Sequence, residues 1–263
     1  MNTTYPNSLT DTEWDYLQRL LPPRSAQSKL RHHSLRSVFD ALFYLVRTGC
    51  PWRYLPAHFP PWQTVYYHFR QFSRTGLWVH LYRELHNAER RRIGKDPHPS
   101  AAMMDSQSIK TVEESAYISG FDVHKHVKGR KRHLLVDTLG LPLSVYVTPA
   151  DMHDTQGARR LLAGLKYFVP RLKHIWADAA YRGQELAEWC KAQGDWDLQV
   201  VERTAGIRGF RVQPKRWVVE RTFGWLSRNR RMSKDYERKV QTSETLIEVA
   251  MIRLLLARLG RGR

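Results

Sequence analysis

Two aspartates stand at the ends of short apolar runs that are typical of strands. Asp105 follows Ala-Ala-Met-Met, and Asp178 follows His-Ile-Trp-Ala. A carboxylate at the close of an apolar strand costs free energy unless it is paired or binds a metal ion. A single such aspartate is explained by a turn or a helix cap, but two of them in the right strand order favour a shared site. Carboxylates from separate elements suit a pair of Mg²⁺ ions about 4 Å apart, the arrangement that cuts and joins phosphodiesters.

A third carboxylate, Glu220, lies in a segment with helical spacing. The apolar face of that segment holds Val219, Phe223 and Leu226. Glu220 shares the adjoining stripe with Gly224 and Ser227, whose small side chains leave room for a DNA backbone. Arg216, four residues earlier, allows instead an ordinary exposed ion pair with Glu220. Spacing alone leaves both interpretations open.

The charge of the chain indicates a polyanionic partner. The 263 residues include 43 Lys and Arg against 25 Asp and Glu, a formal net charge of +18 with a pI near 10.2. By segment, 1–97 carries 14 basic and 7 acidic residues, 98–204 carries 14 and 13, and 205–263 carries 15 and 5. Basic flanks around a nearly neutral, acid-containing centre are expected of a metal-dependent nucleic-acid enzyme, whereas a simple binding module needs no such acids.

The remaining composition excludes several classes of protein. Cys50 and Cys190 are far apart and lie in no CxxC motif, so neither a disulfide framework nor a zinc site is expected, and a reducing cytoplasm fits. The first residues lack the basic and apolar regions of a signal peptide. The longest apolar stretch, 246–259, is interrupted by Arg253 and Arg258 and is shorter than the roughly 20 residues of a membrane span. We therefore expect a soluble cytoplasmic protein, associated with the nucleoid of a bacterium, and no membrane partner.

The elements that position these groups begin with a helical region. Thr10 and Glu13 form a capping-box pattern, Ser34 can cap a second helix that ends before Gly49, and prolines precede a third. Helices are expected from Thr10 to about Leu21, from Ser34 to Thr48, after Pro61, and from Leu77 to about Ile93. A proline-containing linker over 94–100 closes this region.

The third of these helices has two distinct faces. Its apolar stripe consists of Trp62, Val65, Tyr66, Phe69 and Phe72. The opposite face holds Gln63, Tyr67, Arg70 and Arg74, which can hydrogen-bond to bases or phosphates. This face resembles a recognition helix of a helix-turn-helix domain, although solvated surface residues produce the same pattern.

Strands and helices alternate after the linker. Strands are expected at 101–105, 134–137, 141–148, 174–178 and 198–201, and helices at 155–168, 184–191, about 217–230 and about 244–259. Asp137 precedes Thr-Leu-Gly in a hairpin and is interpreted as a turn residue. Three leading strands with an antiparallel hairpin, followed by alternating helices and strands, form the order of the ribonuclease H fold. The predicted class is α/β, a ribonuclease H-like catalytic core with a mixed sheet over 98–263, preceded by a small all-α helix-turn-helix-like domain over 1–97.

Five segments together resemble the transposases of the insertion sequence 5 family, within the insertion sequence 4 superfamily. They are MMDSQSIK at 103–110, KGRKRHLLVDTLGLPL at 128–143, ADMHDTQGA at 150–158, ADAAYRG at 177–183 and RWVVERTFGWLSRNRRM at 216–232. The resemblance covers nearly the whole chain. It implies that Asp105, Asp178 and Glu220 are the catalytic, metal-binding triad of a DDE transposase.

Two positions depart from the superfamily pattern. The pattern has a Tyr three residues before Arg216 and a Lys seven residues after Glu220, where this chain has Gln213 and Ser227. The departures remove any basis for assigning DNA roles to those two positions. Arg228, like Arg230 and Arg231, can replace the missing lysine, and Arg216 matches the arginine of the family motif.

The resemblance also implies a reaction and its partners. Metal-activated water cuts the element's ends, and the released 3′-hydroxyl attacks target DNA, with two Mg²⁺ ions that Mn²⁺ can replace. The expected partner is double-stranded DNA, both terminal inverted repeats and target, and a homodimer is expected in the DNA complex. Two other functions remain open: a nuclease or resolvase on the same fold, and a non-catalytic DNA-binding regulator derived from a transposase.

A basic cluster precedes the hairpin and suits contact with the DNA backbone near the site. It includes Lys125, Lys128, Arg130, Lys131, Arg132 and His133. A solvated charged face is the plain alternative. Tyr181 is a candidate for stacking on a flipped nucleotide.

Overall fold

The computed structural model describes residues 5–23, 32–201 and 216–261, without the side chains of Glu114, Ala116 and Arg216. Its contacts divide the chain into two units. Unit 1 comprises 1–97, 228–232 and 245–263, and unit 2 comprises 98–227 and 233–244. The break at residue 97 lies within the linker expected over 94–100. The domain boundaries expected from the sequence place the whole of the last helix in the catalytic domain, whereas the contacts assign 245–263 to unit 1.

Unit 1 contains the four helices expected in the N-terminal region. They are α1 (Asp11–Leu20), α2 (Leu35–Thr48), α3 (Trp62–Arg74) and α4 (Leu77–Arg92), with a short 3-10 helix η1 (Trp52–Tyr54) between α2 and α3. Both bonds of the capping box are present: the Glu13 N–H donates to the Thr10 hydroxyl and the Thr10 N–H donates to the Glu13 carboxylate. Gly49 ends α2 with a left-handed φ of 74°, a conformation that favours glycine. The predicted helix boundaries are therefore confirmed to within about a residue.

The core of unit 1 is aromatic. Phe39 of α2 packs against Phe72 and Trp78, with ring centroids 5.9 and 5.4 Å away. The buried indole of Trp78 donates its N–H to the Phe69 carbonyl over 3.2 Å. The apolar stripe of α3 thus faces the helices of its own unit, and Val65, Phe69 and Phe72 are buried. Tyr66, which the same stripe includes, is 37% exposed.

Unit 2 is built on one mixed sheet of six strands among the described residues. The strands are β1 (Ala101–Lys110), β2 (Gly120–Asp122), β3 (Val127–Asp137), β4 (Pro142–Pro149), β5 (His174–Ala177) and β6 (Asp197–Val200). The order is β2-β3-β1-β5-β6, with β4 also paired to β3. Pairs of β3 with β1, β2 and β4 are antiparallel, whereas β1/β5 and β5/β6 are parallel. This order and mixture confirm the ribonuclease H-like α/β core that the sequence predicts.

The early strands are longer than expected. β1 runs to Lys110 rather than ending at Asp105, and β3 begins at Val127 rather than at Leu134. The added part of β3 is the basic run, whose alternate charged side chains find partners on opposite faces of the sheet. A 3-10 helix η2 (Glu113–Ile118) and the short β2 between them have no counterpart in the prediction.

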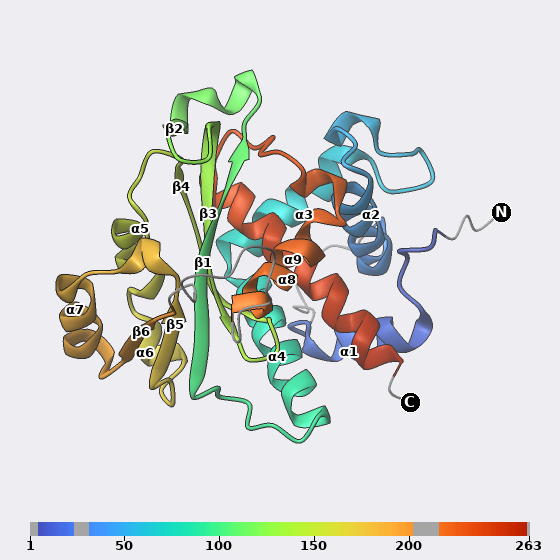
Figure 1. The fold of residues 1–263 in the computed structure, drawn as a ribbon. Helices are drawn as coiled ribbons and strands as arrows, with labels where there is room; N and C mark the ends of the chain where they lie inside the picture. The colour runs from blue at the N-terminus through green and yellow to red at the C-terminus, as the bar shows by residue number, and fades with distance from the viewer. Residues whose placement is uncertain (1–4, 24–31, 202–215, 262–263) are drawn as a thin grey trace. The chain divides into compact units, whose positions relative to one another are not determined.

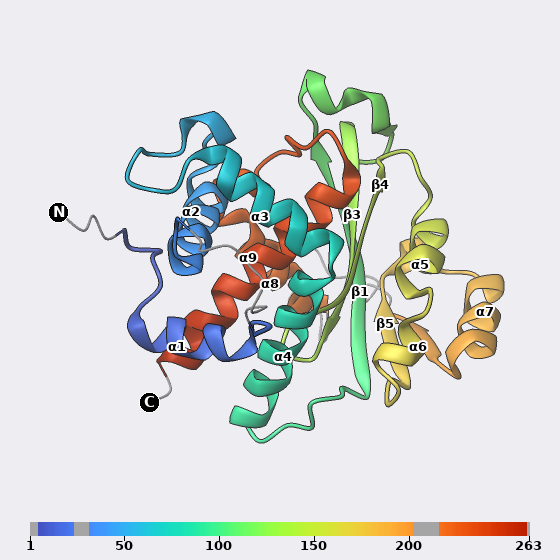
Figure 2. The same cartoon turned by 180° about the vertical axis from the view of Figure 1, so that it is seen from behind.

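Helices cover both faces of the sheet of unit 2 (Figures 1 and 2). On one face lie α5 (Asp154–Leu162), α6 (Leu165–Phe168) and α7 (Gln184–Gly194), and on the other lies α8 (Arg216–Ser227). The helix expected over 155–168 is divided because Gly164 has a left-handed φ of 70°. Buried apolar side chains of α5, α6 and α7 form the main core with Met104 and Leu135 of the sheet.

The last helix, α9 (Val240–Gly260), follows the short 3-10 helix η4 (Arg230–Met232) and begins four residues before the predicted start. Its first residues belong to unit 2 and the rest to unit 1. Over the described residues, no helix has both the length and the apolar character needed to span a bilayer.

Candidate active site

Asp105 lies in the middle of β1, opposite Leu134 of β3. Its side chain is half-buried, and its Oδ1 accepts a hydrogen bond of 2.7 Å from the backbone N–H of Ser106. Side chains alternate between the faces of a strand, so Asp105 and Ser106 belong to opposite faces of the sheet. The carboxylate is thus oriented by the residue that follows it.

Asp178 is the first residue after β5, as the sequence predicts. Its Oδ1 caps the short 3-10 helix η3 (Ala179–Tyr181) by accepting the Ala180 N–H at 3.0 Å. The parallel pairing of β1 with β5 ends at Met103 and Trp176. Continued by two residues, this register brings Asp178 beside Asp105, on neighbouring strands about 4.8 Å apart. The register of the sheet is therefore consistent with the two carboxylates sharing one site.

Tyr181 is the last residue of η3, the 3-10 helix that Asp178 caps. Its side chain is fully buried. Burial raises the pKa of its hydroxyl well above the usual value, and the negative charges of Asp105, Asp154 and Asp178 raise it further. A buried ring cannot stack on a nucleotide, so the role suggested for Tyr181 by sequence is wrong, and the ring packs in the core instead.

Glu220 is an exposed residue of α8. The face of α8 predicted to be apolar, with Val219, Phe223 and Leu226, is buried, and the helix packs against β1 and β3. The hydroxyl of Thr222 donates to the Gly140 carbonyl at 2.6 Å in the β3–β4 turn. The helix that bears Glu220 is thereby held over the strand that bears Asp105.

The β3–β4 turn also explains Asp137. Its Oδ1 accepts the N–H groups of Leu139 and Leu141 at 2.8 and 2.9 Å, and its side chain is fully buried. Asp137 is therefore a structural turn residue, as the sequence predicts, and does not contribute to the site.

The donor chemistry of the site suits a hard divalent ion, because carboxylate oxygens are the preferred ligands of Mg²⁺. Extension of the β1–β5 register by two residues aligns Asp105 with Asp178, and α8, which bears Glu220, packs against the same sheet. Within the described residues, however, no group of three or more acidic, His or Cys side chains is close enough to hold a metal ion. The described side chains thus form no assembled metal site, and the joint role of the three carboxylates stays a prediction.

The basic cluster before the hairpin differs from the solvent-facing group that the sequence suggests. Lys128 is exposed, but Arg130, Lys131 and Arg132 are 0%, 6% and 2% exposed. The cause is the alternation of β3, which turns Arg130 and Arg132 to one face of the sheet and Lys131 to the other. We retain only Lys128 of these residues as a candidate for contact with DNA.

Arg130 binds the segment after α8 to the sheet. Its guanidinium forms an ion pair of 3.1 Å with Asp235, and both side chains are fully buried. It also donates to the carbonyls of Ser115, Ile118, Glu237 and Arg238. Burial lowers the pKa of the neighbouring Arg132 to about 10, an effect that the charge of Asp235 opposes. The two arginines are therefore part of the fold.

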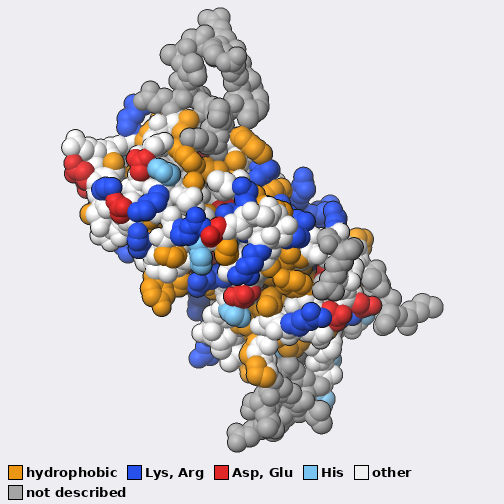
Figure 3. All heavy atoms as spheres, turned by 90° about the horizontal axis from the view of Figure 1, so that it is seen from below, with side chains coloured by type: hydrophobic (Ala, Val, Ile, Leu, Met, Phe, Trp, Pro, Cys, Tyr) orange, Lys and Arg blue, Asp and Glu red, His pale blue; other side chains and the backbone are white. Residues whose placement is uncertain are grey.

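Several of the remaining side chains expected to contact DNA lie at the surface. On α3, Gln63, Tyr67 and Arg74 are exposed and Arg70 is half-buried, which leaves the predicted polar face available to a partner. Arg228 is exposed in unit 1, where its carbonyl accepts a hydrogen bond from Arg47. Arg216 begins α8, but its side chain lies outside the described residues. On the face seen in Figure 3, Lys and Arg side chains are spread among hydrophobic and acidic ones.

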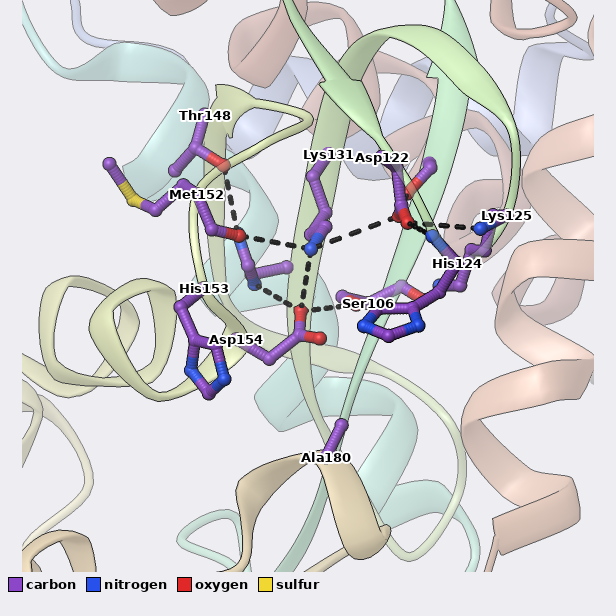
Figure 4. A network of polar contacts seen from close by, with 12 residues as sticks. Ser106, Asp122, His124, Lys125, Lys131, Thr148, Met152, His153, Asp154 and Ala180 are labelled. Atoms are coloured by element: carbon purple, nitrogen blue, oxygen red, sulfur yellow. Dashed lines mark hydrogen bonds and ion pairs between the residues drawn. The ribbon is translucent and has the colours of Figure 1, made fainter.

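Sequence reasoning missed the buried polar side chains behind Asp105. Ser106, Asp122 and Asp154 contact one another or Lys131 on the opposite face of the sheet (Figure 4). They come from β1, β2, α5 and β3, so only the fold brings them together. The sequence offers one signal for this group, the position of Asp154 in the block ADMHDTQGA. An aspartate there is explained equally well as the first residue of a helix.

Family models match two parts of the chain. The family described as "Transposase DDE domain" matches residues 96–255, which is more than half of the chain. The family described as "Putative transposase of IS4/5 family" matches residues 9–82.

Two curated relatives and one solved structure are similar to parts of this chain. A "Putative transposase for insertion sequence element IS6501" from Brucella ovis is 33% identical over 107 residues, which are 39% of this chain and 79% of the relative. A "Putative transposase for insertion sequence element IS402" from Burkholderia cepacia is 29% identical over 118 residues, 42% of this chain and 55% of the relative. A chain in the cryo-electron microscopy structure of the simian T-cell lymphotropic virus intasome with the PP2A regulatory subunit B56 gamma matches with a TM-score of 0.30 and 22% identity, over 49% of this chain and 39% of that one. The match over residues 96–255 carries the conclusion that this chain belongs to the DDE transposase family, of the insertion sequence 4/5 type.

Proposed function

We propose that this protein binds the ends of an insertion sequence and catalyses strand cleavage and strand transfer, with Asp105, Asp178 and Glu220 as its catalytic carboxylates. The observation that supports the proposal is the register of β1 and β5, whose last pair, Met103 and Trp176, lies two residues before both Asp105 and Asp178. Membership of the DDE family supports the reaction class, because this family generally uses divalent metal ions.

In this proposal the three carboxylates hold two Mg²⁺ ions, which Mn²⁺ can replace. Bound ions supply an activated water and stabilise the oxygen that leaves. The chain itself orients the ligands: the Ser106 N–H fixes the Asp105 carboxylate, and the cap on Ala180 fixes that of Asp178. Glu220 faces solvent on α8, a helix that packs against the strand bearing Asp105.

Contact with DNA is assigned to the polar face of α3 and to basic residues of unit 2 and the segment after it. The polar face of α3, with Gln63, Tyr67, Arg70 and Arg74, is proposed to recognise the terminal repeats, and Lys128 to contact backbone phosphates. Arg216 and Arg228 are proposed to contact DNA on the basis of the family motif. A homodimer is proposed in the DNA complex, since two ends have to be joined in one event.

The test is strand cleavage and transfer in Mg²⁺, on duplexes carrying the inverted repeats that flank the coding sequence. The intact protein should nick the ends and join them to a target plasmid, whereas Glu220→Gln should bind with unchanged affinity and not cut. Glu188→Gln provides a matched control, because Glu188 is also an exposed helical glutamate of unit 2.

Three outcomes decide the proposal. Cutting by the intact protein and by Glu188→Gln, but not by Glu220→Gln, supports it. Cutting without joining indicates a nuclease or resolvase, and binding without cutting indicates a DNA-binding regulator.

A further inference from the structure

Behind the catalytic strand lies a cluster of buried charged side chains that the proposed reaction does not use. Lys131 occupies its centre, between Asp122 and Asp154 (Figure 4). The three side chains are only 7%, 5% and 17% exposed. Removing three charges from water is costly, and apolar side chains of similar size often stabilise a core as well as or better than such a group. Stability alone therefore gives a weak reason for this cluster.

The Lys131 ammonium is surrounded by oxygen atoms from three elements. Its Nζ lies 3.0 Å from the Met152 carbonyl, 3.3 Å from Asp154 Oδ1 and 3.9 Å from Asp122 Oδ2. Asp122 in turn accepts the backbone N–H groups of His124 and Lys125 at 3.1 and 3.0 Å. The cluster thus fixes the turn after β2 and the start of α5 against β3.

Ser106 links this cluster to Asp105. Its hydroxyl donates to Asp154 Oδ1 at 2.7 Å, and its carbonyl accepts a hydrogen bond of 3.1 Å from Lys125 Nζ. Its backbone N–H is the group that donates to the Asp105 carboxylate at 2.7 Å. The residue that orients Asp105 is therefore itself held from two sides.

We propose that Asp154, held by Lys131, is a positioning residue that fixes the Asp105 carboxylate for metal binding through Ser106. The inference rests on the proposed function, since it requires Asp105 to bind the ion. The physical reason is that groups that orient a ligand reduce the rotational freedom it loses on coordination. Replacing such a group typically lowers metal affinity or activity by about 10- to 100-fold.

The chain provides a matched control in Ser108. Ser106 and Ser108 lie on the same strand and the same face of the sheet, two residues apart. The Ser108 hydroxyl donates to Asp122 at 2.5 Å, so it also contacts a carboxylate partner of Lys131. It is not adjacent to Asp105. A purely structural cluster should respond similarly to the loss of either hydroxyl.

The experiment measures Mn²⁺ binding to the full-length protein by isothermal titration calorimetry, with thermal unfolding recorded for every variant. We expect Ser106→Ala to weaken Mn²⁺ binding by about 10- to 100-fold. Ser108→Ala should bind within about twofold of the wild type, and Ser106→Thr, which keeps the hydroxyl, should restore most of the affinity. Equal effects of Ser106→Ala and Ser108→Ala overturn the proposal, as does a folded Ser106→Thr as impaired as Ser106→Ala.

Two further variants keep the result interpretable. If Ser106→Ala does not fold, Ser106→Cys replaces it, because a thiol has nearly the same shape and is only a weak donor. Normal Mn²⁺ binding by that variant overturns the proposal. Asp105→Asn separates this inference from the proposed function: if it binds Mn²⁺ like the wild type, the assignment of Asp105 as a ligand has failed. If it does not bind and Ser106→Ala does, only the positioning role has failed.

Discussion

Asp105 and Asp178 both stand two residues beyond the last backbone pair between their strands, Met103 with Trp176. β5 ends at Ala177, whereas β1 continues to Lys110. Both aspartates therefore follow the paired part of the two strands by the same number of residues, as expected of ligands of one site.

This arrangement predicts a shared metal site. Asp105→Asn and Asp178→Asn should each weaken Mn²⁺ binding by at least about tenfold, and the double variant should be little worse than either single one, because ligands of one site are not independent. Calorimetric titration measures all three, with Asp197→Asn, an exposed aspartate of β6, as the control. Fully additive losses contradict a common site.

The two parts of the basic run should behave differently on replacement. Arg130→Met should destabilise the fold by about 3 to 5 kcal/mol, because it leaves the buried Asp235 without its partner. Lys128→Met should leave stability within about 0.5 kcal/mol. It should weaken DNA binding without regard to sequence, as expected for a phosphate contact. Urea unfolding measures the stability of both variants, and titration with duplexes of unrelated sequence measures their affinity for DNA. An Arg130→Met variant that is as stable as the wild type but binds DNA more weakly would indicate that Arg130 contacts DNA.

His133 makes stability depend on acid pH. Burial lowers the pKa of its ring to about 4; the charge of Asp154 opposes this shift, and the charges of Lys131 and Lys125 add to it. The unfolded chain therefore binds the proton first, and stability should fall as pH decreases from about 6.5 toward 4, by up to about 3 kcal/mol. Urea unfolding at pH 7 and pH 5 should show a smaller difference for His133→Gln than for the wild type. An equal difference contradicts the assignment.

Glu244 makes stability depend on pH in the opposite direction. Burial, and to a lesser degree the charge of Asp235, raise its pKa to about 7, although its carboxylate accepts the Val147 N–H. The folded state keeps its proton more tightly, so stability should decrease as pH rises from about 4.5 through 7. Glu244→Gln, which retains the acceptor, should be more stable than the wild type by about 1 to 3 kcal/mol at pH 8 and similar at pH 5. Unfolding at both pH values tests this, and a variant that is less stable at pH 8 contradicts it.

Two glycines in helices of unit 2 should respond oppositely to alanine. A Cβ on Gly157 of α5 would lie 2.2 Å from the His133 ring, so Gly157→Ala should cost about 1 to 3 kcal/mol. A Cβ on Gly224 of α8 meets nothing within 4 Å, so Gly224→Ala should stabilise by about 0.5 to 1 kcal/mol. Urea denaturation of the two variants checks the pair. A gain from Gly157→Ala would show that the ring can move aside.

Local signals gave the most accurate predictions. The cap at Thr10 and the Gly49 stop fix their helices within a residue, and Asp137 was correctly interpreted as a turn residue. These features depend only on neighbours in the chain. The strand before Asp178 was predicted to within a residue for the same reason, since its apolar run ends immediately before that aspartate.

The parts that could not be predicted depend on distant partners. The basic run of β3 has the composition of a loop, but it pairs with β1 and β4, and Arg130 is buried against Asp235, 105 positions later. The contact between Ser106 and Asp154 spans 48 positions and involves two unremarkable polar residues. No periodicity in the sequence marks either contact, because each is created by the sheet.

The alternation of β3 has a consequence for how this segment can change in evolution. Arg130 requires an acid and several carbonyls on one face, while Lys131 requires two carboxylates on the other. A substitution at either position disturbs one face of the sheet. The insertion or deletion of one residue in β3 would instead turn Arg130 and Lys131 to the opposite faces, away from their partners. The charged strand is therefore compatible with a single register, and because β3 pairs with β1, the same two sets of partners also fix the position of Asp105 along the sheet.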